Sequence, residues 1–331
     1  MLTPQTPVLQ STTLPAASEV QASDNHHQED YQQLVKEIFL RHLIDGSVKE
    51  NERQNIVTGV SLVDLASHRT LVNHNQDTEQ FAASINKLPV GLLLLEDLRS
   101  GTLSPGQTLT WTADDRRDGF GEFDQPGSPL SAPLEDVLYD MLHSSGNTAV
   151  RILVNKGLGG AAAVNDRFAA KPELSHTRLQ PLDASRFFLG NSTPRDSLWT
   201  IDQLMKRQDR YARFMKDAMA DNIFEEFGVR SQLADDDYIL LVNKVGILDD
   251  TEGNNRHDVG ILYNKKTRAS YAYSFFTTAP YNEIDPSATV RADQSLKDMG
   301  RSLLHFADSH KTYQSDQRTR YNRLPDERIR Y

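Results

Sequence analysis

The chain has 331 residues, of which 38% are hydrophobic, 25% are charged and none is cysteine. This length and apolar content suffice for one large core or two, while the absence of cysteine excludes disulfides, thiolate metal sites and a cysteine nucleophile. The net charge of −10 argues against a nucleic-acid partner, because binding phosphates needs a basic face.

Both ends of the chain are polar. Residues 1–29 are rich in Thr, Pro, Ser and Gln and hold few large apolar residues, so we predict a disordered leader there. Residues 311–331 carry six basic residues against three acidic ones, which indicates a polar basic tail in solvent. We expect no signal peptide and no transmembrane segment in these 331 residues, because the longest apolar run, Leu88–Leu95, is too short to cross a bilayer.

The segments between these ends, residues 30–310, show regular patterns. Apolar spacing over Asp30–Ile44 predicts an amphipathic helix. The stretch 55–75 reads as two strands with a turn at Ala66–Arg69. Helical patterns follow, and the last of them begins with a capping box and a proline at its first position. These predicted helices are Ser84–Arg99, Pro133–His143, Asn147–Lys156, Ala161–Phe168 and one that starts at Thr193-Pro194-Arg195-Asp196.

Three later segments, separated by polar turns, predict an antiparallel meander: Tyr238–Gly246, His257–Asn264 and Arg268–Thr278. One apolar stripe over residues 288–308 predicts a closing helix. The order favours an α/β fold of the α+β type. An antiparallel sheet with strands from both chain ends (residues 30–83 and about 205–310) is flanked by helices and encloses an inserted all-helical region (about 84–204).

Ser84 and Lys87 stand three residues apart at the front of a predicted helix. Residues i and i+3 are neighbours on a helix surface, and a serine hydroxyl needs a nearby base to act as a nucleophile. A lysine that burial has neutralised can be that base. The spacing alone is weak evidence, because about one Ser-x-x-Lys is expected by chance in a chain this long. Read by itself, Ser84 is a helix cap and Lys87 a solvated charge.

Two further segments strengthen the case by their order. Ser145-Gly146-Asn147 and Lys244-Val245-Gly246 follow Ser84 and Lys87 along the chain. Together the three segments resemble the Ser-x-x-Lys, Ser-Asp-Asn and Lys-Thr-Gly signatures of class A serine β-lactamases and their penicillin-binding relatives. The chain departs from these signatures at Gly146 and Val245. The glycine puts the bracing of its loop in doubt, and the valine removes a hydroxyl that would help to bind a substrate carboxylate.

The resemblance also implies roles for individual residues. Ser84 attacks the acyl carbon and Lys87 accepts its proton, directly or through water. Ser145 passes a proton to the departing nitrogen. Asp183, in a segment that resembles the start of the family's surface loop, stands where a deacylating glutamate is expected. The substrate-binding residues are Asn147, Lys244, Gly246 and Ile247, and the backbone N–H groups of Ser84 and Ile247 form an oxyanion hole.

We therefore expect a serine hydrolase that acts on β-lactams or related amides through an acyl-enzyme. A cell-wall D-alanyl peptidase or esterase of the same fold is one alternative, and a catalytically impaired penicillin-binding relative is another. The resemblance implies a small-molecule substrate, a monomer, no cofactor and no metal, and a location outside the cytoplasm.

Overall fold

The computed structural model describes residues 17–183, 186–233, 237–250, 253–280 and 286–309. Residues 1–16 of the predicted leader and the predicted basic tail lie outside the described residues. Helix α1 runs over Ala17–Arg53, so residues 17–29, which we predicted to be disordered, are helical. Alanine, glutamate and glutamine favour helices, and extending a nucleated helix costs far less than starting one.

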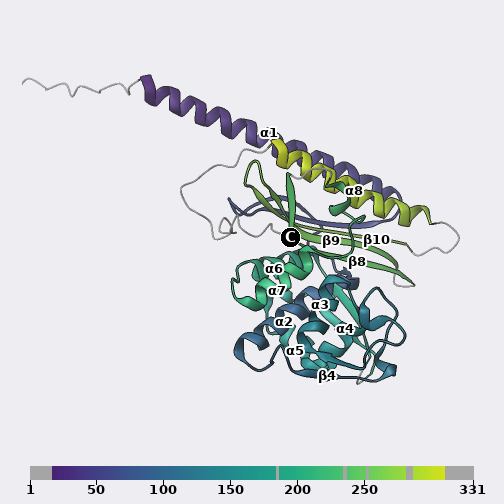
Figure 1. Ribbon diagram of the computed structural model, residues 1–331. Helices are drawn as coiled ribbons and strands as arrows, with labels where there is room; N and C mark the ends of the chain where they lie inside the picture. The colour runs from purple at the N-terminus through teal and green to yellow at the C-terminus, as the bar shows by residue number, and fades with distance from the viewer. Residues whose placement is uncertain (1–16, 184–185, 234–236, 251–252, 281–285, 310–331) are drawn as a thin grey trace, which may run out of the picture.

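A five-stranded antiparallel sheet forms the upper half of the molecule in Figure 1, with the strand order β2-β1-β10-β9-β8. The N-terminal pair β1 and β2 joins the C-terminal meander through β1 and β10, where Val57 lies opposite Thr278. The predicted sheet built from both chain ends is thereby confirmed. The five strands are β1 (Val57–Asp64), β2 (Arg69–His74), β8 (Tyr238–Asp250), β9 (Gly253–Asn264) and β10 (Ser270–Ala279).

Both faces of this sheet are covered. Helices α1 and α8 (Ser287–Ser309) run side by side over one face, and α6 (Pro194–Met205) packs on the other, at the top of the helical region (Figure 1). On β10, Tyr271, Tyr273 and Phe275 belong to the core beneath α1 and α8, whereas Ala272 and Phe276 belong to the core shared with the helical region. The strand therefore reads as almost continuously apolar.

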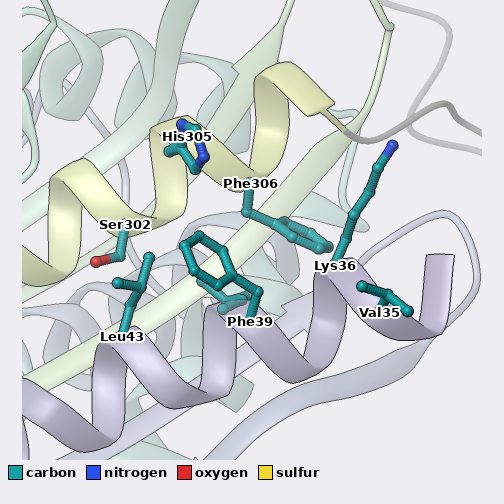
Figure 2. Close-up of a pocket in the computed structure, with 8 residues that line it drawn as sticks. Val35, Lys36, Phe39, Leu43, Ser302, His305 and Phe306 are labelled. Atoms are coloured by element: carbon teal, nitrogen blue, oxygen red, sulfur yellow. The ribbon is translucent and has the colours of Figure 1, made fainter. Parts of the chain in front are cut away.

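Helices α1 and α8 leave a shallow cavity of about 250 Å³ between them. Figure 2 shows the Phe39 ring beside His305, with the two ring centres 6.0 Å apart. The face of α1 beside this cavity leaves Leu34, Val35 and Ile38 exposed. None of the described helices is long and apolar enough to cross a membrane.

The inserted region is mainly helical, as predicted. Thr193 caps α6 through a hydrogen bond of 3.1 Å from the Asp196 N–H to its hydroxyl, which confirms the predicted start of this helix. The Asp196 carboxylate accepts from the Thr193 hydroxyl at 3.0 Å. Helix α7 was not predicted. The remaining helices are α2 (Lys87–Ser100), α3 (Leu134–His143), α4 (Asn147–Ile152) with a π-helical continuation over Leu153–Gly157, α5 (Ala161–Ala169) and α7 (Arg210–Ala220). Short 3₁₀ turns lie at Ala83–Asn86, Ala113–Asp115, Glu122–Asp124, Pro172–Leu174 and Arg230–Gln232.

The inserted region is not all-helical, however. It contains a two-stranded sheet and most of a three-stranded one with the order β3-β7-β6. The segment that we predicted to be a loop from His176 onward is largely the β6–β7 pair. These strands are two to six residues long, and so short a segment carries no readable period. They are β3 (Gln80–Phe81), β4 (Thr108–Thr110), β5 (Ser131–Pro133), β6 (Arg178–Pro181) and β7 (Phe187–Ser192).

Candidate active site

Ser84 lies on the 3₁₀ turn Ala83–Asn86, and Lys87 is the first residue of α2. We predicted a single α-helix from Ser84, but the first turn is tighter. In a 3₁₀ turn the side chains at i and i+3 eclipse, so the two residues still share one side. Ala83 has a φ of 46°, in the left-handed region. An alanine there costs free energy, and such strain is common at functional sites.

Two anchors fix this turn from outside. The Asn86 amide, which is fully buried, donates to the carbonyl oxygens of Arg178 at 3.3 Å and Asn191 at 3.0 Å, and so ties the turn to β6 and β7. The His257 ring accepts from the Thr277 N–H at 3.2 Å, which leaves its other nitrogen to donate to the Phe81 carbonyl at 2.8 Å. Burial lowers the pKa of His257 to about 4, so the ring is neutral.

The Lys87 amine is fully buried and faces the Ser145 loop. It donates to the Ser145 carbonyl oxygen, to the Ser145 hydroxyl at 3.1 Å and to the Asn147 side-chain oxygen at 2.9 Å. These three contacts match the three donors of an ammonium group. In the described part of the chain, Ser84 is therefore not among the partners of the protonated amine.

The Ser145 hydroxyl is shared by two lysines. Lys244, which is 1% exposed, donates to it at 2.9 Å from strand β8, and also donates to its neighbouring Val245 carbonyl at 3.0 Å. The hydroxyl and the two amines come from residues as far apart in the sequence as 87 and 244. Ser145 itself has a φ of 58°, so the loop is held in an uncommon conformation that points its side chain between the lysines.

Burial shapes the charge of this group. It lowers the pKa of Lys87 to about 7, although the negative charges of Asp124 and Asp140 oppose the shift. The pKa of Lys244 lies well below its usual value, first because of burial and second because of the positive charge on Lys87. Two buried amines that share one hydroxyl cannot both be charged at low cost. Near neutral pH, Lys87 is therefore close to half protonated, and Lys244 gives up its proton more readily than an exposed lysine does.

Gly146 occupies the place of the aspartate in the Ser-Asp-Asn signature, and the structure gives the reason. A Cβ on Gly146 would lie 2.2 Å from the Asp140 carboxylate oxygen Oδ2. Asp140 comes from the end of α3, and its other oxygen accepts the Glu122 N–H at 2.8 Å. A carboxylate from the preceding helix thus fills the space beside Gly146. The loop is braced from a different residue, contrary to the doubt raised by the sequence.

Asp124 is a second carboxylate that braces the same loop. Its carboxylate accepts the N–H groups of Asn147 at 3.1 Å, Thr148 at 2.7 Å and Gly121 at 2.9 Å. The carboxylate thereby caps the start of α4. The Asn147 amide donates to the Asp118 carbonyl at 2.7 Å, so the loop before Asp124 is tied to the site as well.

The Lys244-Val245-Gly246 segment lies on β8, directly against the turn that carries Ser84. A Cβ on Gly246 would lie 2.9 Å from both the Ala82 carbonyl oxygen and the Ile85 side chain. Because the Ser84 segment approaches this closely, only glycine fits. We expected the glycine to admit a substrate backbone, but the backbone that approaches it here belongs to the protein itself.

A cavity of about 540 Å³ opens beside this group. Four of the predicted site residues line it: Ser84, Ser145, Asn147 and Ile247. The charged glycine-rich stretch before Asp124 also reaches it, through Arg117, Asp118 and Phe120. Lys87 and Lys244 lie behind these lining residues, in contact with the Ser145 hydroxyl.

Asp183 differs from its expected position. Its carboxylate accepts the Arg186 N–H at 2.7 Å and binds the Arg186 guanidinium. Its neighbour Leu182 lines the cavity instead. The β6–β7 segment therefore presents a leucine, rather than a carboxylate, to the space beside Ser84.

Several residues of the site carry no sequence signal. Asp124, Asp140 and His257 belong to none of the three signatures, and each acts through tertiary contacts with segments far along the chain. Asn86, inside the Ser-x-x-Lys motif, could have been singled out as a polar residue in an apolar run. In the described ranges, no group of three or more His, Asp or Glu residues could hold a metal ion.

Known proteins share this fold. A model of the Beta-lactamase enzyme family matches residues 40–305, and the chain belongs to that family. A comparison with curated proteins finds no match. Family membership and the fold together define a serine hydrolase of the β-lactamase and penicillin-binding type.

Solved structures of the same fold include three with low sequence identity. The chromosome-encoded β-lactamase of Vibrio parahaemolyticus is 18% identical, with a TM-score of 0.68, over 81% of this chain and all of that one (100%). The β-lactamase of Sphaerobacter thermophilus is 20% identical, with a TM-score of 0.65, over 80% and 96% of the two chains. PBP-A is also 20% identical, with a TM-score of 0.65, over 80% of this chain and 96% of that one. Identities this low support the fold rather than a particular activity.

Proposed function

We propose that this protein forms an acyl-enzyme on Ser84 and hydrolyses β-lactams or related amides. The observation that carries the proposal is the Ser145 hydroxyl, which lies between two buried amines, 3.1 Å from Lys87 and 2.9 Å from Lys244. The same hydroxyl and Ser84 line one cavity. Such an arrangement moves protons between a nucleophile and a leaving group.

In this proposal, neutral Lys87 takes the proton of Ser84 as the hydroxyl attacks the acyl carbon, directly or through water. A pKa near 7 suits a base at neutral pH. The Ser145 hydroxyl then gives its proton to the departing nitrogen and regains one from the amines. Lys244 supports this transfer from β8.

Three further groups bind the substrate. An amide has two N–H donors, and the one that Asn147 does not give to Asp118 can hold a substrate carbonyl. The backbone N–H groups of Ser84 and Ile247 stabilise the developing oxyanion. Losing one such donor typically costs about 2.7–4 kcal/mol of transition-state stabilisation. Gly246 serves the site indirectly, because it lets β8 approach the nucleophile turn.

Covalent labelling tests the proposal. The protein is incubated with an excess of a fluorescent penicillin, and the adduct is mapped by mass spectrometry. We expect one adduct on the peptide that contains Ser84, none in Ser84→Ala, and an unchanged adduct in the control Ser100→Ala at the far, exposed end of α2. An adduct that survives Ser84→Ala, or none in any protein, refutes acylation of Ser84 by penicillins.

A second candidate function is a penicillin-binding peptidase or esterase whose acyl-enzyme is long-lived. It is favoured by the position of Leu182, which lines the cavity while the Asp183 carboxylate binds Arg186. Without a carboxylate at the position of Leu182 to orient water, the ester on Ser84 is expected to hydrolyse slowly. The time course of adduct loss separates the two: decay within milliseconds to seconds indicates a β-lactamase, and an adduct that persists for hours indicates the second candidate.

A further inference from the structure

The wall of the cavity formed by β8 is aliphatic. Val245, Ile247 and Leu248 line it, and none of these side chains has a hydrogen-bonding group. The Lys244 amine lies behind them and donates hydrogen bonds to the Ser145 hydroxyl at 2.9 Å and to the Val245 carbonyl at 3.0 Å. Lys244 is 1% exposed and is not among the residues that line the cavity, so this wall offers an anionic group neither an accessible amine nor a hydroxyl.

Aromatic side chains from four separate segments surround the same cavity. Phe81 meets Phe188 edge-on with ring centres 6.5 Å apart, and Phe120 meets Phe224 edge-on at 5.6 Å. Phe120 is 66% exposed and Phe188 is 46% exposed, although large apolar side chains are normally buried. Exposed apolar groups that gather around a hollow mark a site for an apolar ligand.

Two of the three guanidinium groups on the lining lie beside carboxylates of the protein. Arg186 is bound to Asp183, and Arg151 lies 3.5 Å from the Asp115 carboxylate. The third, Arg117, donates through Nη1 to the carbonyl oxygens of Asp114 at 3.2 Å and Arg116 at 2.6 Å.

The negatively charged residue on the lining is Asp118, which would repel an anionic substrate. The Asp118 backbone already takes part in the site, because its carbonyl accepts the Asn147 amide at 2.7 Å. The lining as a whole therefore provides apolar contact on several sides, and each of its three arginines has a carboxylate nearby: Asp115 beside Arg151, Asp183 beside Arg186 and, next in the sequence, Asp118 after Arg117.

We propose that the preferred substrate is an uncharged ester or amide with apolar groups on both sides of the scissile bond, rather than a compound with a carboxylate next to that bond. This inference rests on the proposed acyl-enzyme function. In the reaction, the Ser84 oxygen bonds to the acyl carbon and the bond from that carbon to the leaving oxygen or nitrogen breaks. The leaving group departs as an alcohol or amine with the proton passed on by Ser145, and water later releases the neutral acyl group as an acid.

Matched probe pairs test the inference. The first pair is benzylpenicillin and its methyl ester, and the second is mono-p-nitrophenyl succinate and p-nitrophenyl butyrate. In each pair the reactive group is the same and a carboxylate is present in only one member. Acylation rate constants of Ser84 are measured by intact-protein mass spectrometry. We expect the neutral member of each pair to react at least ten times faster, about the effect of one hydrogen bond to a charged group.

Val245→Thr supplies the missing hydroxyl on the cavity wall. We expect it to raise the ratio of the carboxylate rate to the neutral rate by about tenfold or more. Val72→Thr makes the same exchange at a buried position on β2, at the opposite edge of the sheet from β8, and should leave that ratio unchanged.

The two levels of the proposal fail differently. A carboxylate probe that reacts as fast as its neutral partner, or a ratio that Val245→Thr does not move, overturns the substrate inference while the acyl-enzyme stands. If none of the four probes forms an adduct on Ser84, the proposed function itself is wrong, and the substrate inference falls with it.

Discussion

The Asp140–Gly146 contact predicts that one carboxylate, and only one, fits beside the Ser145 loop. In Gly146→Asp the new Cβ would lie 2.2 Å from Oδ2 of Asp140 and 2.9 Å from its Cγ. Overpacking of this kind costs about 1–3 kcal/mol. A second carboxylate beside the first adds about 1.4 kcal/mol for each unit by which it raises the pKa of either group. The φ of −53° at Gly146 suits any residue, so backbone strain adds nothing.

We therefore expect Gly146→Asp to lose about 3 kcal/mol, which lowers the melting temperature by roughly 6–12 °C in a domain of this size. Asp140→Ala alone leaves the Glu122 N–H without its acceptor and costs about 1–3 kcal/mol. The double variant removes the clash and returns a carboxylate, so it should be more stable than the sum of the single changes predicts, by about 2 kcal/mol.

Thermal unfolding of the four proteins, followed by Ser84 labelling rates, measures this coupling. Gly106→Asp is the control, because a Cβ there meets nothing within 4 Å. If the two single changes add to within about 0.5 kcal/mol, Asp140 and Gly146 do not share one space and the reasoning is wrong.

Three further predictions follow from the site. The pKa of Lys87 is about 7 and only its neutral form accepts a proton, so the rate of Ser84 acylation should rise with pH with a midpoint near 7. Asp140→Asn removes a negative charge that raises this pKa and should shift the midpoint to lower pH. A rate that does not change from pH 5.5 to 8.5 would exclude Lys87 as the base. Gly246→Ala should slow acylation at least tenfold and cost about 1–3 kcal/mol of stability, because the new Cβ would lie 2.9 Å from the Ala82 carbonyl oxygen. The control is Gly46→Ala, where a Cβ meets nothing within 4 Å. Equal labelling rates for the two variants would contradict the tight fit at Gly246. Leu182→Glu places a carboxylate on the cavity lining and should shorten the acyl-enzyme lifetime at least tenfold, as measured by the loss of the adduct. The control is Leu130→Glu at an exposed position outside the cavity lining, which should leave the lifetime unchanged. An unchanged lifetime in Leu182→Glu would show that another group orients the water.

The periodic spacing of apolar residues predicted most of the fold. The apolar stripe of α8 and the three strands β8, β9 and β10 were readable because each is long enough to repeat its pattern. Strand β3 has two residues and pairs with β7, where Gln80 lies opposite Ser192. A pairing so short and so distant leaves no pattern in either segment.

The site was predictable only where a motif preserved chain order. Lys87, Ser145 and Lys244 were found together because three short segments follow one another in a recognisable sequence. Asp140 was not predicted to belong to the site, because its role depends on the absence of a side chain at Gly146. The presence of a glycine in the sequence does not show which residue fills the space beside it. For Asp183 the sequence did not show which side chain faces the cavity, and in the structure it is the preceding Leu182 that lines it.

Because Val57 pairs with Thr278, the sheet is completed only late in synthesis. Ser84, Lys87 and Ser145 all emerge before β10, which is the second neighbour of β1, and the second amine arrives only with β8. Folds dominated by such distant pairings form slowly, so a nascent chain passes through an interval in which the Ser145 hydroxyl has no second amine beside it. The acylation that we propose on Ser84 therefore depends on the meander, and a chain cut short before β8 lacks that amine.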